Sequence, residues 1–245
     1  MSLHAGRLAF GGAVLFDDLD MTLEGGRFTV LLGPSGVGKS SLLRLIAGLE
    51  RRADDAVRCS DGAPLRGRVA WMAQDDQLLP WLSVLDNVLL GPWLRGRPEE
   101  ADRRKAKGLL ADVGLAEAAG ARPDALSGGM RQRAALARTL MEDRAVVLMD
   151  EPFSALDAVT RLRLQDLAGR LLAGRTVLLV THDPLEALRL GDRVHVLSGR
   201  PARLDDALLP PGAPPRAAGD ASLLALQADL LDRLARAAES DGGAA

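Results

Sequence analysis

Several residue types are scarce in this sequence, and each scarcity excludes a class of protein. The 245 residues include a single cysteine, Cys59, which excludes a disulfide framework and fits a reducing cytosol. The formal net charge is −2, whereas general nucleic-acid binding requires a basic face. No apolar run reaches the roughly 18 residues of a membrane-spanning helix, and no cationic start precedes an apolar segment. We therefore expect no nucleic-acid partner, no membrane span and no secretory signal.

Lysine and tyrosine are scarce in a chain that is otherwise rich in apolar residues. Lysine occurs only at positions 39, 105 and 107, and tyrosine does not occur at all. Apolar residues make up 47% of the chain, which is enough for a sizeable core in one large or two small domains. The lysine at position 39 ends a glycine-rich stretch, where its compact ammonium is not interchangeable with the wider guanidinium of arginine.

Residues 33–40 match the phosphate-binding pattern G-x-x-x-x-G-K-[ST]. The apolar run 28–32 precedes them as a short strand, and apolar residues at helical spacing follow from Ser40 onward. Glycines at such a turn let backbone N–H groups approach phosphates, and the helix start adds partial positive charge. We expect Lys39 to reach the β- and γ-phosphates of ATP and Ser40 to bind Mg²⁺. The alternative is a glycine-rich turn that binds nothing. The expected nucleotide-binding residues are Gly33, Pro34, Ser35, Gly36, Val37, Gly38, Lys39, Ser40 and Ser41.

A second apolar segment, residues 145–149, ends in two acids, Asp150 and Glu151. Such runs are typical of parallel strands that are covered on both faces. Because ligands of open parallel sheets lie beyond the carboxyl ends of the strands, both acids fall on the edge that carries the phosphate loop. We expect Asp150 to hold Mg²⁺, directly or through water, and Glu151 to be the general base for the attacking water. The alternative is a pair of acids that begin a turn at Pro152.

Two polar residues end further strands at this edge. His182 follows the apolar strand 175–180, from where its side chain can donate to the γ-phosphate and help to hold the water. Gln74 follows the strand 68–73, and its neutral amide can contact Mg²⁺ or the water and swing away when the nucleotide leaves. By itself, a histidine at a strand end is more often structural, and Gln74 alone is uninformative.

A second glycine-rich helix start lies at Ser127, Gly128 and Gly129. Apolar residues recur behind it at helical spacing as far as Met141, and Ser127 occupies the cap position. One nucleotide does not need two anion-binding cradles in one chain. The alternative is an ordinary serine-capped helix.

Together these motifs resemble, in order and spacing, those of the nucleotide-binding subunit of ABC transporters. The resemblance covers about residues 3 to 200 and is carried by the phosphate loop, Gln74, Leu126 to Arg133, Asp150-Glu151, Ser154 to Asp157 and His182. It implies that two copies pair head to tail around ATP. Ser127, Gly128 and Gly129 would then contact the γ-phosphate held by the partner, and Asp157 would link the two sites.

The same family stacks an aromatic residue on the adenine, from a strand before the phosphate loop. Because tyrosine is absent, Phe10 takes this place by resemblance, with Phe16 as the alternative. A phenyl ring can still stack, although it lacks the hydrogen bond of a phenol.

The order of the segments predicts an α/β fold, a P-loop NTPase core with a mainly parallel sheet, an N-terminal antiparallel β portion and an inserted α-helical subdomain. We expect an ATPase domain over residues 1–200 with the helical insert at about 76–140, a proline-rich linker over 201–221 and a helix over 222–240. Leu223, Leu226, Leu230 and Leu234 form one stripe of that helix, which could pack on its own domain or on a partner; we favour its own domain.

Residues 77–88 place Leu, Pro and Trp directly after Gln74, as in an apolar docking surface, with core packing as the alternative. The resemblance implies that this region receives the membrane subunit of an importer. Its Leu-Leu-Pro-Trp string resembles the same segment in the importer branch that takes up nitrate, sulfonates, taurine or thiamine-pyrimidine precursors. Within that branch, Trp71, Trp93 and the short loop before Arg68 slightly favour the pyrimidine-precursor members.

The sequence therefore predicts the ATP-hydrolysing subunit of an ABC importer. Its expected partners are membrane permease subunits, a second copy of itself and, indirectly, a solute-binding protein, and its expected place is the cytoplasmic face of the inner membrane. The alternatives are the ATPase of an exporter or lipid-extracting complex, a soluble ABC ATPase that acts on DNA or the ribosome, and a small-molecule kinase with the same loop.

Overall fold

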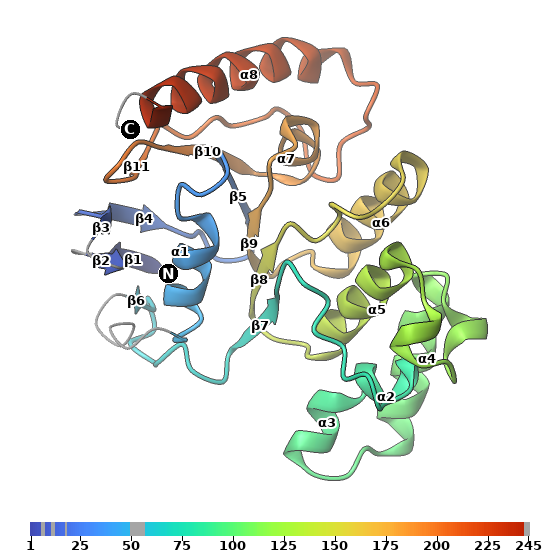
Figure 1. Cartoon of the computed structure of the whole chain (residues 1–245). Coiled ribbons are helices and arrows are strands. Elements are labelled where there is room, and N and C mark those ends of the chain that lie inside the picture. Colours follow the sequence, from blue (N-terminus) through green and yellow to red (C-terminus); the bar gives the residue numbers. More distant parts are fainter. Residues whose placement is uncertain (6–7, 11–12, 18, 50–56, 243–245) are drawn as a thin grey trace.

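The computed structural model describes residues 1–5, 8–10, 13–17, 19–49 and 57–242, and its centre is a mainly parallel sheet (Figure 1). The strand order is β11-β10-β5-β9-β8-β7, in which β11 alone runs antiparallel to its neighbour. The strands are β5 (Phe28–Leu32), β7 (Val69–Met72), β8 (Val146–Asp150), β9 (Thr176–Val180), β10 (Arg193–Ser198) and β11 (Arg203–Leu204).

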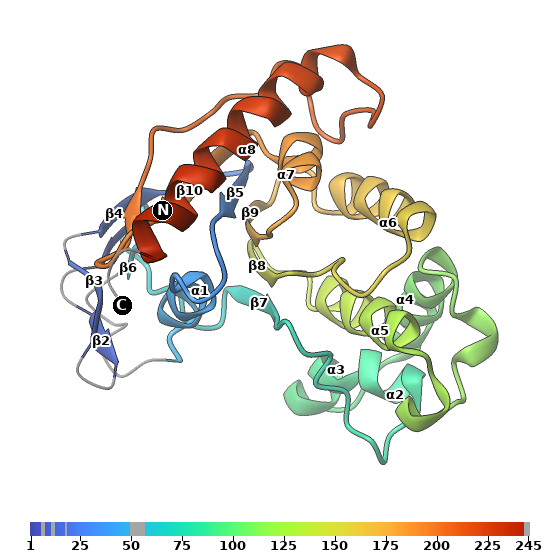
Figure 2. The ribbon, with the colours of Figure 1, turned by 45° about the horizontal axis from the view of Figure 1, so that its top comes forward.

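Helices cover both faces of this sheet, so β5 and β8 are buried throughout, as their apolar sequences predict. Successive side chains of a strand point to opposite faces. In β8, Val147 and Met149 therefore belong to one hydrophobic core, and Val146 and Leu148 belong to the other. Figure 2 shows the covering helices, which are α1 (Lys39–Ile46) on one face and α5 (Gly128–Met141), α6 (Ala158–Leu171) and α7 (Pro184–Leu190) on the other.

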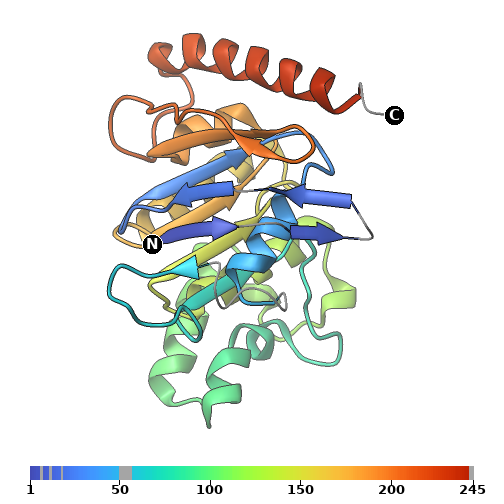
Figure 3. The same cartoon turned by 90° about the vertical axis from the view of Figure 1, so that its left-hand side faces the viewer.

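An antiparallel layer lies outside α1 and confirms the expected N-terminal β portion. Its members are β1 (Ser2–Ala5), which pairs with β4 (Leu19–Thr22) and β6 (Val57–Arg58), and β2 (Leu8–Phe10), which pairs with β3 (Ala13–Phe16). Figure 3 shows these strands in front of α1 and the parallel sheet.

Between β7 and β8 the chain forms a helical block, at the lower right of Figure 1. It consists of α2 (Val84–Val88), α3 (Leu90–Arg95), α4 (Glu100–Asp112), the 3₁₀ turns η1 (Ala116–Ala118) and η2 (Pro123–Ala125), and α5. The buried side chain of Asn87 shapes the loop before α2, because its amide bonds to the backbone of Leu79, Leu82 and Ser83.

Residues 77–88 divide between the two roles expected for them. Leu78, Val84 and Val88 are buried in the core beneath α5, whereas the Trp81 side chain is 66% exposed. These three buried residues therefore stabilise the helical block, whereas Trp81 presents an apolar surface.

A buried arginine fastens the chain that follows β11. The Arg216 guanidinium donates to backbone carbonyl oxygens of Pro210, Pro211, Gly212, Leu188 and Gly191. This clamp holds the proline-rich segment against the end of α7. The last helix, α8 (Ala221–Gly242), then packs on β10 and α7 of its own chain, with Leu223 and Leu230 buried. No helix in the described part of the chain is long and apolar enough to cross a bilayer.

Candidate functional site

The phosphate loop joins β5 to α1, and close packing requires its glycines. Gly36 and Gly38 adopt φ values of 81° and 109°, in the left-handed region that favours glycine. A Cβ atom at Gly33 would lie 2.5 Å from the carbonyl oxygen of Leu197, and one at Gly38 would lie 3.1 Å from the ring of Phe16. The loop can therefore follow this path only without side chains at these positions.

The Lys39 side chain folds back over the loop. Its ammonium donates to the carbonyl oxygens of Gly33 at 2.7 Å and Pro34 at 2.8 Å, and the residue is buried. Burial lowers the pKa of Lys39, and the negative charges of Glu151 and Asp150 oppose this shift. The ammonium thus lies at the loop with neutral acceptors that phosphate oxygens can replace.

Asp150 ends β8 beneath the start of α1 and is almost fully buried. Burial raises the pKa of its carboxyl group, a hydrogen bond with the Ser40 side chain lowers it, and the charge of Glu151 raises it again. Lys39 provides a further, smaller stabilisation of the carboxylate. Asp150 and Ser40, one at a strand end and one at a helix start, are therefore direct neighbours.

The donor set around Ser40 fits Mg²⁺. The Ser40 hydroxyl, the Asp150 carboxylate and the Gln74 amide offer the hard oxygen atoms that this ion prefers. Within the described residues, no cluster of three or more His, Cys, Asp or Glu is placed to hold a metal. These oxygen atoms can hold an ion whose remaining ligands come from phosphate or water.

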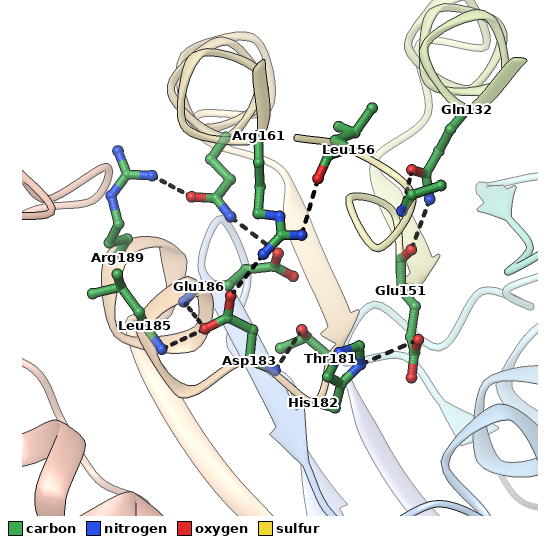
Figure 4. A network of polar contacts seen from close by, with 12 residues as sticks. Gln132, Glu151, Leu156, Arg161, Thr181, His182, Asp183, Leu185, Glu186 and Arg189 are labelled. Carbon is green, nitrogen blue, oxygen red and sulfur yellow. Dashed lines mark hydrogen bonds and ion pairs between the residues drawn. The ribbon is translucent and has the colours of Figure 1, made fainter. Parts of the chain in front are cut away.

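Glu151 leaves β8 in a strained backbone conformation. Its φ is +47°, in the left-handed region, which costs a bulky residue about 1 kcal/mol or more. Its backbone N–H donates to the carbonyl oxygen of Val180, and its carboxylate lies 3.2 Å from Nδ1 of His182 (Figure 4). The His182 side chain is 62% exposed, so its ring is accessible from outside while it contacts the acid.

A cavity of about 250 Å³ opens in front of the phosphate loop. It is lined by Leu15, Ser35, Gly36, Gly38, Lys39, Ser40, Ser41, Gln74 and Glu151. Predicted residues from three separate segments therefore meet in one place. Val37, also predicted, is buried in the core below the loop. Leu15 is the residue that sequence reasoning missed; its signal was strand alternation, which turns Leu15 away from its buried neighbour Phe16.

The second glycine-rich helix start, at Ser127, Gly128 and Gly129, does not line this cavity. Ser127 and Gly128 are exposed, and the Ser127 hydroxyl caps its own helix by accepting the N–H of Met130. Asp157 is also exposed and caps α6 by accepting the N–H of Thr160, a hydrogen bond that lowers the pKa of its carboxyl group. These predicted residues thus lie at the surface, apart from the phosphate loop of their own chain.

Of the two aromatic side chains that are candidates for adenine stacking, the structure describes only that of Phe16. The backbone of Phe10 ends β2, but its side chain lies outside the described residues. The alternative, Phe16, is fully buried beneath Gly38, so its ring is not available to a nucleotide in this conformation.

A larger cleft of about 520 Å³ separates α1 from the helical block. It is lined by Arg44, Leu49, Trp71, Gln77, Leu90, Gly91, Leu94, Arg138, Thr139 and Glu142. Leu49 and Leu94 are 62% and 79% exposed, so the cleft has an apolar rim. Concave surfaces with exposed apolar residues and interspersed charges are typical of protein docking sites.

Comparisons with known proteins agree with this geometry. A family described as "ABC transporter" matches residues 16–154. A protein of Haemophilus influenzae, called an uncharacterized ABC transporter ATP-binding protein, is 48% identical over 93% of this chain and 95% of its own length. The chain therefore belongs to the ATP-binding proteins of ABC transporters.

Two further proteins refine this assignment. A Rhodococcus jostii protein named "Aliphatic sulfonates import ATP-binding protein SsuB 1" is 50% identical, with 90% of this chain and 87% of its own covered. The dimeric ATP-binding cassette MJ0796, solved in a post-hydrolysis state with ADP and Pi, has a TM-score of 0.73 at 28% identity. That match covers 86% of this chain and 100% of the cassette. The expected family, fold and enzyme class, a transport ATPase, are confirmed.

Proposed function

We propose that this chain is the ATP-hydrolysing subunit of an importer for a small solute of the sulfonate type. The observation that carries the proposal is the meeting of Lys39, Ser40, Gln74 and Glu151 at one cavity, with Asp150 beneath and His182 beside it. The relative named for aliphatic sulfonates import supports the solute class over the nitrate, taurine and thiamine-pyrimidine alternatives. The same name favours import over export.

The phosphate loop is proposed to bind ATP by exchanging its internal contacts. The Lys39 ammonium would leave the carbonyl oxygens of Gly33 and Pro34 for the β- and γ-phosphates, whose charge compensates its burial. The N–H groups at the start of α1 would bind the same oxygens. Mg²⁺ would be held by Ser40 and Asp150, with Gln74 nearby, and would neutralise phosphate charge. Phe10 remains the proposed adenine contact.

Glu151 is proposed as the general base. Its carboxylate would accept a proton from the attacking water, whose oxygen bonds to the γ-phosphorus as the bond to ADP breaks. His182, at 3.2 Å, can orient that carboxylate and, being exposed, can also donate toward the γ-phosphate. The pair thus places an acceptor and a donor at the same end of the sheet.

Catalysis is proposed to require a second copy of the chain. Ser127, Gly128 and Gly129 would contact the γ-phosphate held by the partner, and Asp157 would link the sites. Two observations support this: these residues do not line the cavity of their own chain, and the related cassette MJ0796 is dimeric with ADP and Pi bound. The helix start at Ser127 then supplies backbone N–H groups to an anion that its own chain does not hold.

The cleft between α1 and the helical block is proposed to receive a membrane permease subunit at the cytoplasmic face of the inner membrane. Gln74 lines the nucleotide cavity and Gln77 lines the cleft, so the short segment between them connects the two sites. A solute-binding protein would act through the membrane subunits. The importer family of the relatives supports these partners.

Co-purification and dimer formation test the proposal. A tagged chain should bring down a multispan membrane protein, and recovery of nucleic acid instead would exclude the transporter role. Glu151→Gln should abolish hydrolysis yet form an ATP-dependent dimer on gel filtration, and a persistent monomer would count against the shared site. Ser127→Arg should abolish turnover while ATP binding by the monomer stays near normal; loss of that binding would contradict the role in the partner's site.

A further inference from the structure

The loop between β8 and α6, residues 151–157, begins with Glu151 and ends with Asp157, and it has no regular structure of its own. The left-handed φ of +47° at Glu151 has to be held by surrounding contacts, because an unsupported chain would relax from it. At the far end, Arg161 donates to the carbonyl oxygen of Leu156 at 3.0 Å and pairs with Asp183. At the near end, the Glu151 N–H donates to the carbonyl oxygen of Val180, and the Glu151 carbonyl oxygen accepts the hydroxyl and the N–H of Ser154.

Gln132 adds the contacts that tie this end of the loop to α5 (Figure 4). Its side-chain Nε2 donates to the carbonyl oxygen of Glu151 at 3.1 Å and to Oγ of Ser154 at 3.3 Å. Its Oε1 accepts the N–H of Ala155 at 2.9 Å. The Gln132 side chain is buried, so these bonds are shielded from water and would leave unsatisfied groups if broken. One amide thus bridges three residues of the loop.

The first turn of α5 touches the loop at a second point. A Cβ atom at Gly129 would lie 3.3 Å from the carbonyl oxygen of Ala155 and 3.5 Å from the Leu156 side chain. Gly129 and Gln132 are three residues apart, so they share one face of the helix. The turn that begins with Ser127 and the loop that begins with Glu151 are therefore packed together without a gap.

We propose that Gln132 is a positioning residue that sets the place of Glu151 relative to the turn at Ser127. The inference rests on the proposed function, in which Glu151 acts on ATP bound by its own chain and Ser127 contacts ATP bound by the partner. A shift of α5 when Ser127 meets that phosphate would then move the Glu151 backbone through a single buried amide.

Paired substitutions in the full chain test this role. Gln132→Met keeps the length of the side chain but removes all three hydrogen bonds. Gln165→Met is the matched control: Gln165 is equally buried and bonds to Glu186, but to nothing in the loop. Steady-state hydrolysis over a range of ATP concentrations gives kcat and KM, and thermal unfolding reports stability.

Gln132→Met should lower kcat about 10- to 100-fold while KM changes less than about twofold, because misplaced catalytic groups affect turnover and the phosphate loop is untouched. Gln165→Met should keep kcat within about threefold even if it unfolds earlier. An unchanged kcat or an equal loss in the control overturns the proposal.

A second variant covers the case in which Gln132→Met does not fold. Gln132→Glu retains the acceptor for the Ala155 N–H but lacks the donor to the Glu151 carbonyl, so it should lose kcat with KM preserved; a wild-type kcat overturns the proposal. The proposed function is judged separately. If the wild-type chain, together with its membrane subunits, hydrolyses no ATP, that function fails; if it hydrolyses ATP and both Gln132 variants match it, only the positioning role fails.

Discussion

Glu186 is a buried acid whose replacement should change how stability depends on pH. It lies in the first turn of α7 with only 3% of its surface exposed. Burial raises the pKa of Glu186 to about 7. A Thr181 hydrogen bond opposes the rise, and the charge of Asp183 adds to it. A Gln165 hydrogen bond and the charge of Arg161, both from α6, favour the carboxylate. Figure 4 shows this acid between α6 and α7.

The sign follows from the protons bound in each state. Between pH 4.5 and about 7 the folded protein keeps a proton on Glu186 that the unfolded chain has released. The contribution of Glu186 to stability is therefore largest below pH 4.5. It falls as the pH rises from 4.5 to about 7, and it stays constant above pH 7. At 1.36 kcal/mol per pH unit, the loss is roughly 3 kcal/mol.

Glu186→Gln should remove this dependence, because the amide has the same shape and does not titrate in this range. As the pH rises from 4.5 to 8, the free energy of unfolding of the variant should increase by roughly 3 kcal/mol relative to that of the wild type. This difference corresponds to about 6 to 12 °C in melting temperature for a chain of this size. Urea unfolding at several pH values measures the difference. Glu117→Gln, at an exposed carboxylate, is the control. Parallel curves for Glu186→Gln and the wild type would refute the reasoning.

Three other substitutions test parts of the fold and site. Arg216→Met removes the donor to five backbone carbonyl oxygens, so it should destabilise the protein by about 3 kcal/mol and expose residues 210–216 to protease; an unchanged digestion pattern would contradict the clamp. Gly38→Ala should lower ATP affinity at least about tenfold in a binding titration, because of its φ of 109° and the nearby Phe16 ring, and wild-type affinity would show that the loop adapts. Asn87→Ala should cost about 2 kcal/mol in urea unfolding, since four bonds to the 79–83 loop are lost; a cost near zero would mean that water replaces them.

The chemistry of the site could be predicted from the sequence because it lies in short contiguous motifs. The phosphate loop needs its glycines and Lys39 at fixed spacing, so the pattern itself carries the geometry. The apolar strands before Asp150 and His182 point to a parallel sheet, and parallel strands bring their carboxyl ends to one edge. That rule is sufficient to group Lys39, Asp150, Glu151 and His182 from the sequence alone.

Other features depend on contacts between distant segments, which no local pattern records. The large cleft takes Leu49 from beyond the end of α1 and Leu94 from α3, which lie 45 positions apart in the sequence, so no local pattern indicates it. Likewise, the burial of Phe16 beneath Gly38 depends on how the antiparallel layer packs against α1.

The sequence by itself determined which chemical groups the protein offers to a nucleotide, since each motif fixes its own backbone shape and places its own functional atoms. Tertiary packing decided which of those groups share a cavity, which remain at the surface, and how Gln132 ties Glu151 to the helix that begins at the Ser127 turn. These relations arise from close packing among residues far apart in the chain, and side-chain volume and hydrogen-bond satisfaction settle them only once the layers are assembled.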